Sequence, residues 1–370
     1  MTKKILPLMA AFSTAFIFNA CGDDSSSSAN NYEESSSSVA QTVYVFGSDY
    51  KTGELRTIEG DSAISASGVA FNQDSKLVVA GGNMFVLERY GADNIVLFDA
   101  EKGTAAWQVS AGEFSNPADI VAAGEGKAWV ALEGTASFIQ ISTMDGKIEK
   151  TVKTDSFVSA GGYSPNLVDF EVSGDTLFAI FQRYVYDATT YTTNFPKGLL
   201  AMYKLSDGSL LDTIQLATKN PMAVKAVNGN IYVATQGEYN AAFGTDADDN
   251  RGIEKIDLAQ KASVLYVSGK KLGGGVSNMV VDYNSGIAYA AVYQGYGFVP
   301  VAKVDLSTGD VTTIKDIADA EGGLAYDEAN GLLYVGDRSY ESEKVLVYDG
   351  SAVVAIDNGN ALAPYSIVLF

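Results

Sequence analysis

Short apolar runs separated by polar turns fill the chain from about residue 41 to its end. Valine, isoleucine, tyrosine and phenylalanine dominate these runs, and such side chains favour strands. No stretch shows the repeat of about 3.6 residues that an amphipathic helix requires. Glycine, asparagine, aspartate and serine separate the runs, and these are common turn residues. The pattern therefore predicts an all-β protein.

One unit recurs along this region at intervals of about 50 residues. Each unit begins with an apolar strand, continues through a second strand and a loop of variable length, and ends with a third and a fourth strand. We expect first strands to start near Gly68, Pro117, Pro165, Pro221, Ser277, Gly322 and Pro364. Four strands in a repeat of this length are typical of one blade of a β-propeller.

The two ends of the repeat region complement each other. Residues 42–58 look like a third and a fourth strand, whereas residues 364–370 look like a lone first strand. If they share one blade of three or more strands, the ring closes and leaves no open sheet edge. We therefore predict a seven-bladed β-propeller over residues 42–370, closed by N- and C-terminal strands that share one blade. Rings of six or eight blades, a pair of β-sandwiches and a β-helix are the alternatives.

Charge and two residue types exclude several functions. The chain has 45 acidic and 25 basic residues, which gives a formal net charge of −20. Nucleic acids and acidic membrane surfaces bind basic patches, so neither is an expected partner. The sequence contains no histidine, which excludes Ser–His and Cys–His catalysis and histidine-bound zinc. Cys21 is the only cysteine, which excludes an internal disulfide and a cysteine-rich metal site.

Residues 1–20 have the features of a bacterial lipoprotein signal peptide. Lys3 and Lys4 precede an apolar stretch that is too short to span a membrane, and Ala20-Cys21 follows it. We expect lipid to be attached to Cys21, with an ordinary signal peptide as the alternative. Residues 21–41 are rich in serine and acidic residues, so they are expected to form a disordered tether. The expected location is the bacterial outer membrane, on its cell-surface or its periplasmic side.

The loops between second and third strands vary most in length and hold unusual residues. Long ones are expected at about residues 81–94, 182–198, 237–251, 294–300 and 337–344. Variable loops on a rigid scaffold are common binding sites. Four of the five arginines and many tyrosines fall in or beside these loops, and both residue types are enriched at binding hot spots. The candidate ligand-binding residues are Arg89, Tyr90, Arg183, Tyr184, Tyr186, Tyr239, Arg251, Tyr296, Arg338 and Tyr340. The alternative is that the rings pack the loops onto the blades and each arginine pairs with a local acid.

An acidic loop at residues 246–250 resembles a calcium-binding loop only in part. Its glycine, Gly252, comes one position late, and no glutamate follows at the twelfth position. We therefore expect a solvated acidic tip in this loop, and we expect neither a metal site nor a cofactor in the chain.

Several short motifs resemble those of the YncE-like, or YVTN-type, seven-bladed propellers. They are Leu87–Gly91, Asn94–Val96, Asn116–Asp119, Thr176–Arg183, Asn220–Pro221 and Gly252–Glu254. Related bacterial lipoproteins are often surface partners of TonB-dependent outer-membrane transporters, and one branch captures corrinoids. The resemblance therefore implies a binding role beside a transporter, without naming the ligand.

Three classes of function remain open at this stage. The first is a non-catalytic envelope lipoprotein whose loops bind a small molecule, a glycan or a protein partner. The second is an enzyme that uses a pair of carboxylates, such as a glycosidase or a lyase, because such chemistry needs no histidine. The third is a structural or adhesion scaffold. The tether and the arginines and tyrosines of the loops favour the first, and no catalytic residue is assigned.

Overall fold

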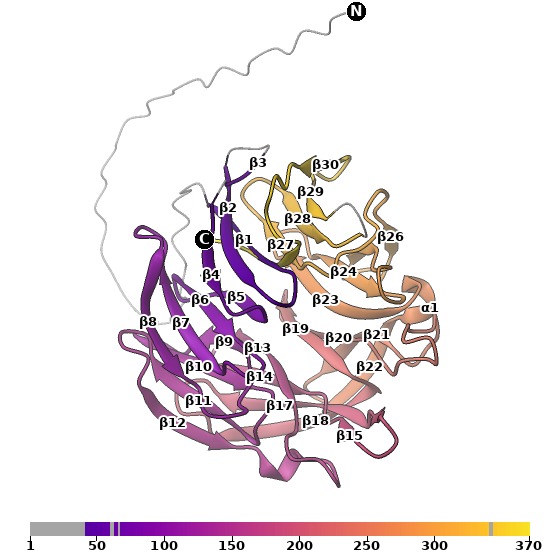
Figure 1. Cartoon of the computed structure of the whole chain (residues 1–370). Helices are drawn as coiled ribbons and strands as arrows, with labels where there is room; N and C mark the ends of the chain where they lie inside the picture. Colours follow the sequence, from indigo (N-terminus) through magenta and orange to yellow (C-terminus); the bar gives the residue numbers. More distant parts are fainter. Residues whose placement is uncertain (1–40, 60–62, 66, 340–342) are drawn as a thin grey trace, which may run out of the picture. The chain divides into compact units, whose positions relative to one another are not determined.

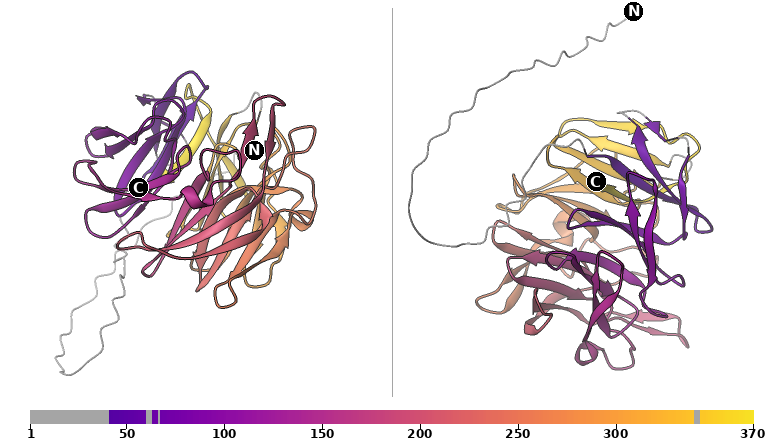
Figure 2. Two further views of the ribbon diagram at one scale, coloured as in Figure 1. Left: turned by 90° about the horizontal axis from the view of Figure 1, so that it is seen from below. Right: turned by 90° about the vertical axis from the view of Figure 1, so that its left-hand side faces the viewer.

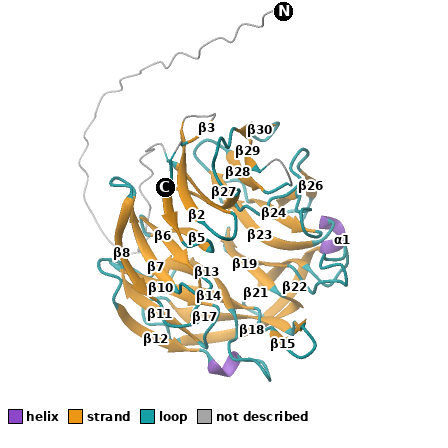
Figure 3. Cartoon of the chain, viewed as in Figure 1, coloured by secondary structure: helices purple, strands orange, loops and turns teal. Residues whose placement is uncertain are grey.

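The computed structural model describes residues 41–59, 63–65, 67–339 and 343–370. The expected signal peptide, Cys21 and all but the last residue of the expected tether lie outside these residues. The described residues belong to one structural unit and are almost entirely strand and loop (Figure 3). Among them, helix α1 (Gly269–Leu272) is a single turn, and no helix has the length and apolar character needed to cross a membrane.

Six blades are four-stranded antiparallel sheets whose strands follow one another in chain order. Blade 1 contains β5 (Ser75–Ala80), β6 (Asn83–Glu88), β7 (Asn94–Asp99) and β8 (Thr104–Ser110). Blade 2 contains β9 (Pro117–Ala122), β10 (Lys127–Leu132), β11 (Ser137–Ser142) and β12 (Ile148–Lys153). Blade 3 contains β13 (Leu167–Ser173), β14 (Thr176–Phe181), β17 (Lys197–Lys204) and β18 (Leu210–Lys219), with the hairpin β15 (Val185–Asp187) and β16 (Thr192–Asn194) inserted between its second and third strands.

The next three blades repeat the same order. Blade 4 contains β19 (Pro221–Val227), β20 (Asn230–Thr235), β21 (Gly252–Asp257) and β22 (Ala262–Ser268). Blade 5 contains β23 (Gly275–Asp282), β24 (Ile287–Tyr293), β25 (Val301–Asp305) and β26 (Val311–Thr313). Blade 6 contains β27 (Leu324–Asp327), β28 (Leu332–Asp337), β29 (Lys344–Tyr348) and β30 (Val353–Ile356).

Blade 7 joins the two ends of the described chain. Its inner strand is β31 (Pro364–Leu369), which pairs with β1 (Val43–Ser48), and β1 pairs in turn with β2 (Gly53–Glu59). The outer edge of β2 pairs with two short strands, β3 (Ala63–Ile64) and β4 (Val69–Phe71). The shared closing blade is therefore confirmed.

The inner strands of the blades form a closed ring. Each inner strand contacts the inner strand of the next blade, from β5 through β9, β13, β19, β23 and β27 to β31, and β31 contacts β5. Figures 1 and 2 show the sheets succeeding one another along the chain until the C-terminal strands lie beside the first ones. The predicted seven-bladed β-propeller is confirmed.

Apolar side chains fill each seam between neighbouring blades. The described residues contain seven buried apolar clusters, and each cluster joins two adjacent blades. In β6, Met84 and Val86 face blade 7, whereas Phe85 and Leu87 face blade 2, and all four are fully buried. Because both faces of a blade are covered, the second strands have continuous apolar runs instead of an apolar–polar alternation.

The strand assignment in blade 1 corrects one prediction. The strand predicted near Gly68 as the first of a blade is β4, the outer edge of blade 7, and residues 81–94, predicted as a loop, contain β6. Gly81 and Gly82 both have positive φ and form a two-residue turn between paired Ala80 and Asn83. A turn with two positive φ values matches the twist of a hairpin and strongly favours glycine.

The connections between second and third strands and those between blades emerge at one end of the sheets, because the strands of each blade alternate in direction. We call this end the loop face. It holds the long loop at residues 182–196, the loop at residues 236–251 and the blade 2 to blade 3 connection at residues 154–166. Four of the five arginines lie on connections of the loop face.

Candidate functional site

A pocket of about 760 Å³ opens on the loop face, at the ends of blades 1, 2 and 3. Five connections line it: β6–β7, β8–β9, β10–β11, β12–β13 and β14–β17, the last of which includes β15. Its volume lies in the range of small-molecule binding sites, roughly 300–1,000 Å³. We call it the blade 1–3 pocket.

Aromatic rings dominate the blade 1–3 pocket. The lining includes Tyr90, Phe114, Tyr163, Tyr184 and Tyr186. Tyr90, Phe114 and Tyr163 are 80%, 74% and 82% exposed, and Tyr186 is 47% exposed. Rings gathered around one cavity yet left in contact with water are typical of a binding surface, because they stabilise the protein little by burial.

Glu133 gives one wall of the pocket an acidic character. Its Oε2 accepts a hydrogen bond from Asn116 Nδ2 at 2.7 Å, and its Oε1 accepts a longer one from Tyr184 Oη at 3.3 Å. Burial raises the pKa of Glu133, while the nearby Arg89 guanidinium opposes that rise. Two further carboxylates, of Asp93 and Glu113, line the pocket, and none of the described lining residues is lysine or arginine.

Phe114 is held in a backbone conformation that is unusual for a bulky residue. Its φ is +59°, in the left-handed region, and its ring is exposed. The carboxylate of Asp93 holds this turn, because Oδ2 accepts the backbone N–H of Phe114 at 2.9 Å and Oδ1 accepts that of Asn116 at 2.8 Å. Strain of this kind gathers at functional sites.

The loops around Phe114 lie in close backbone contact. A side chain at Gly134 would place its Cβ 2.0 Å from the carbonyl oxygen of Phe114, so only glycine fits there. Ser164 Oγ donates to the carbonyl oxygen of Glu133 at 2.5 Å, which joins the β12–β13 connection to the β10–β11 connection. The backbone of the pocket is therefore fixed by the protein itself.

Asn166 adds an unpartnered acceptor to the lining. Its side chain is 7% exposed, and its Oδ1 has no hydrogen-bond partner among the described residues. A buried polar atom without a partner costs about 1–3 kcal/mol. A ligand that brought a donor to this oxygen would remove that cost.

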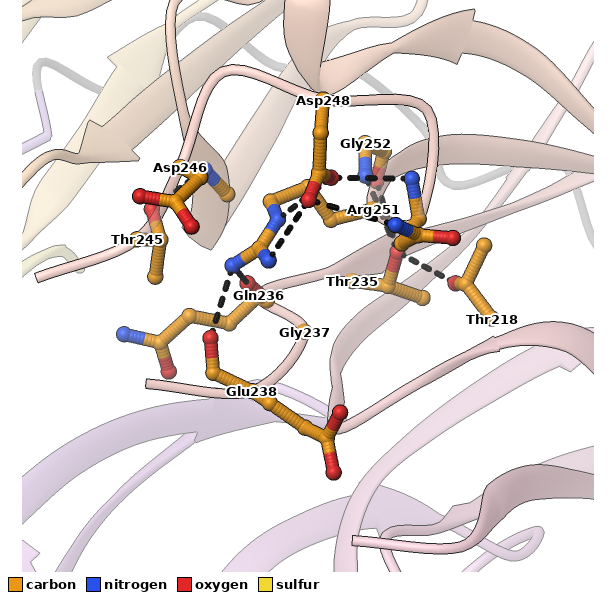
Figure 4. A network of polar contacts seen from close by, with 12 residues as sticks. Thr218, Thr235, Gln236, Gly237, Glu238, Thr245, Asp246, Asp248, Arg251 and Gly252 are labelled. Carbon is orange, nitrogen blue, oxygen red and sulfur yellow. Dashed lines mark hydrogen bonds and ion pairs between the residues drawn. The ribbon is translucent and has the colours of Figure 1, made fainter. Parts of the chain in front are cut away.

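Arg251, one of the predicted ligand-binding residues, is used inside its own loop (Figure 4). It is 5% exposed, and its Nε and Nη2 donate to the carboxylate of Asp248 at 2.9 and 3.1 Å. Its Nη1 donates to the carbonyl oxygens of Gln236 and Glu238 at 3.2 and 2.8 Å. The alternative of a local acid pair therefore describes Arg251, and the acid is Asp248.

Arg89 and Arg183 hold loops beside the pocket without lining it. The Nη2 and Nε of Arg89 donate to Asp74 Oδ1 at 2.8 and 3.2 Å. The Nε of Arg183 donates to the carbonyl oxygen of Phe157 at 2.9 Å, and its own carbonyl oxygen accepts from Ser159 Oγ at 2.7 Å. Both arginines thus fix the conformation of the loops that surround the pocket.

Arg338 stabilises the closure of the ring. Its Nη1 donates to the carbonyl oxygen of Pro364 at 2.6 Å, and its Nη2 donates to that of Ser48 at 3.3 Å. Its guanidinium also lies over the rings of Tyr50 and Tyr365, with Cζ 5.0 and 5.6 Å from the ring centroids. These contacts tie blade 6 to both terminal strands of blade 7.

Two of the remaining predicted tyrosines, Tyr239 and Tyr296, do not line the pocket. Tyr239 belongs to a row of rings across blades 3 to 5, in which adjacent centroids are 5.8, 5.9 and 6.0 Å apart: Tyr184, Phe195, Tyr239 and Tyr293. Tyr296 is 81% exposed on the blade 5 loop. Tyr340 lies outside the described residues. Of the ten predicted residues, the pocket brings together Tyr90, Tyr184 and Tyr186.

Comparisons with solved structures identify the same architecture. The chain is similar to AztD from Citrobacter koseri, with a TM-score of 0.51 and 12% identity over 89% of this chain and 97% of that chain. A functionally unknown protein from Desulfotomaculum acetoxidans DSM 771 matches with a TM-score of 0.58 and 12% identity, covering 89% of this chain and 99% of that chain. These likenesses show the fold alone. No protein-family model and no curated protein matches the sequence.

A second polar feature, on the inner strands, escaped the sequence analysis. Polar side chains there accept backbone N–H groups from the inner strand of the next blade. Asp119 Oδ2 accepts from Phe170 at 3.0 Å, and Asp169 Oδ2 accepts from Val224 at 2.8 Å. These bonds join blades 2, 3 and 4 at the centre of the ring, so they have a structural role.

Lysines partly balance these buried carboxylates. Lys225 Nζ lies 3.5 Å from Asp169 and 3.9 Å from Glu171, and Lys76 Nζ lies 3.8 Å from Asp119. Burial outweighs these attractions and raises the pKa of Asp119 and of Glu171 to about 7. The cluster is therefore sensitive to pH near neutrality.

The acidic loop at residues 246–250 is occupied by contacts of its own. Asp248 pairs with Arg251 (Figure 4). Asp246 Oδ1 accepts from Asn240 Nδ2 at 2.9 Å. The described part of the chain contains no group of three histidine, cysteine or acidic side chains spaced to hold a metal ion.

The sequence analysis missed Phe114, Glu133 and Tyr163 as pocket residues. It concentrated on the loops after second strands, whereas Phe114 and Tyr163 lie on connections between blades. A usable signal was present, because Phe114 lies three residues and Tyr163 two residues before a proline that begins or precedes a first strand. An aromatic side chain in that position lies on a connection and not in the packed interior of a blade.

Proposed function

We propose that this protein is a non-catalytic ligand-binding β-propeller of the YncE-like type, and that it captures a small molecule in the blade 1–3 pocket. The observation that supports this most is Phe114, an exposed aromatic residue in a left-handed conformation at the pocket. Phe243, on the blade 4 loop, is also exposed with a positive φ. What distinguishes Phe114 is its place in the lining of a pocket, where a ligand can contact the ring.

The proposed setting is the bacterial outer membrane. Lipid on Cys21 would anchor the protein, and residues 21–41 would let the propeller move above the membrane surface at the end of a flexible tether. A transporter of the outer membrane is the proposed partner, since a capture protein needs a route for its ligand. The support for this setting is the sequence of residues 1–41 and the resemblance to the YncE-like propellers.

The carboxylate-enzyme alternative has less support at this pocket. Both oxygens of Asp93 accept backbone N–H groups, so this carboxylate is committed to holding the turn at Phe114. Glu133 is engaged with Asn116 and Tyr184. A glycosidase needs one carboxyl group that protonates the substrate and a second, ionised one opposite it.

A ligand screen with a pocket variant tests the proposed function. Thermal-shift measurements on the purified protein would use sugars, corrinoids, amines and short peptides, followed by titration of each hit. Tyr186→Ala is expected to weaken binding of the true ligand about tenfold or more, because it removes an exposed ring of the lining. The matched control is Tyr296→Ala, which removes an exposed ring outside the pocket.

Two results would contradict the proposal. One is a bound ligand whose affinity falls with Tyr296→Ala and not with Tyr186→Ala, since the binding site would then lie over blade 5. The other is turnover of a glycoside that is lost when one carboxylate is replaced, since the protein would then be an enzyme.

A further inference from the structure

The rings of the blade 1–3 pocket favour a positively charged guest. The faces of aromatic rings carry negative partial charge and attract ammonium groups that come within about 6 Å of the ring centroid. Phe114, Tyr163 and Tyr186 offer this attraction from three different connections, β8–β9, β12–β13 and β14–β17, the last of which contains β15. The three residues are 74%, 82% and 47% exposed, so part of each ring is available to a guest.

The negative charge of the lining also favours a positively charged guest. The carboxylates of Asp93, Glu113 and Glu133 line the pocket, and the ion pairs of the described residues involve none of them. Arg89 is near Glu133, but its guanidinium is bonded to Asp74. Within the described part of the chain, no cation is therefore paired with the carboxylates of the pocket.

The polar atoms of the lining also favour a ligand that donates hydrogen bonds. Asn166 Oδ1 is a buried acceptor without a hydrogen-bond partner among the described residues, and Glu133 contributes carboxylate oxygens to the same lining. An anion such as phosphate or a carboxylate would be repelled by the acidic side chains of the lining, because no described lining residue is basic.

We propose that the ligand of the blade 1–3 pocket is an organic ammonium ion, held by cation–π contact with Phe114, Tyr163 and Tyr186 and by the negative charge of Glu133. This inference rests on the proposed function, because it names the ligand class of the same pocket. A neutral sugar is the competing class, since it also stacks on rings and donates hydroxyl hydrogens. Charge separates the two.

A pair of ligands of equal shape tests the role of charge. Choline and 3,3-dimethyl-1-butanol have the same hydroxyl group and the same branched head, but only choline is charged. Titrations of the full mature protein would follow tyrosine and tryptophan fluorescence or ligand NMR signals. We expect choline to bind about tenfold or more tightly than its neutral counterpart. Benzyltrimethylammonium, spermidine, cellobiose and inorganic phosphate complete the panel.

Two substitutions assign the effect to the pocket. Glu133→Gln keeps the side-chain shape and an oxygen acceptor but removes the charge, so choline affinity should fall about fivefold while that of the neutral alcohol stays the same. Its control is Glu101→Gln, which removes one exposed carboxylate from the β7–β8 turn on the opposite side from the loop face. Tyr163→Leu removes one ring and should lower the affinity for every ammonium ligand.

The outcomes separate this inference from the proposed function. If no ammonium ion binds, or if choline and its neutral counterpart bind equally, the inference is wrong. If cellobiose or phosphate binds instead and Tyr163→Leu weakens that binding, the pocket is a ligand site for another class and the proposed function stands. If nothing in the panel responds to Tyr163→Leu while the screen yields a ligand unaffected by Tyr186→Ala, both fail.

Discussion

At the scale of single residues, Phe114 shows how the loops of the pocket keep an aromatic ring exposed. A phenylalanine normally gains stability from burial, yet this ring is 74% exposed and its backbone is in the left-handed region. Asp93 stabilises this turn with two hydrogen bonds, and Gly134 lets the neighbouring loop approach it. Several local features thus keep an unfavourable residue in place.

Replacing Phe114 by asparagine should separate stability from binding. Asparagine tolerates the left-handed region better than phenylalanine, so the free energy of unfolding should stay the same or rise by up to about 1 kcal/mol. Ligand affinity should fall about tenfold, because an aromatic contact is lost. Chemical denaturation and ligand titration of the same variant would measure both. A marked loss of stability would instead show that the Phe114 ring is a packing residue.

The arginines show what residue counting can and cannot predict. The sequence was sufficient to place four of the five arginines on one face, because their loops follow second strands. It could not show that Arg251 donates to Asp248 and to two carbonyl oxygens, since those partners depend on the folded path of the loop. The tyrosines were more informative, because Tyr90 and Tyr186 line the pocket as predicted. Among the described residues, neither side chain makes hydrogen bonds within its own loop like those of Arg251.

At the scale of elements, the strand order was predictable wherever the turns were ordinary. The first strands predicted near Pro117, Pro221 and Pro364 correspond to β9, β19 and β31. The prediction for blade 1 was wrong because it placed the start of a long loop at Gly81-Gly82. The pair forms a two-residue hairpin turn, and Phe85 lies fully buried in the strand that follows.

The inner strands add a pH dependence that the sequence did not reveal. Asp119 is buried between blades 2 and 3, and burial raises its pKa from an ordinary 3.8 to about 7. Between these two values the folded state binds this proton more strongly than the unfolded state. The stabilisation is therefore complete below about pH 4 and is lost as pH rises towards 7.

Asp119→Asn should remove this dependence. Asparagine retains an oxygen that can accept the N–H of Phe170, and it has no charge to bury. The free energy of unfolding of the variant minus that of the natural protein should therefore increase as pH rises from 4 to 8, because only the natural protein loses stability. Urea denaturation at a series of pH values would measure it. The carboxylates of Asp169 and Glu171 and the ammonium groups of Lys76 and Lys225 are present in both proteins. The difference therefore reports on residue 119 and on the effect of its charge on the pKa of Glu171. A constant or opposite difference would show that Asp119 is ionised throughout the range.

At the scale of the whole propeller, the closed ring gives the loops a rigid base. β31 pairs with β1 and contacts β5 and β27, and Arg338 bonds to both terminal strands. The sequence was sufficient to predict this closure, because an incomplete blade at one end matched a lone strand at the other. The pocket was less predictable, since five connections from three blades form it and their meeting depends on the ring itself.

A crystal structure of the protein soaked with choline tests the central claim most directly. We predict density for the ammonium group against the rings of Phe114, Tyr163 and Tyr186, with Glu133 in the same pocket. Density for choline on the blade 5 loop near Tyr296, or an empty blade 1–3 pocket in a crystal whose protein binds choline in solution, would contradict the account.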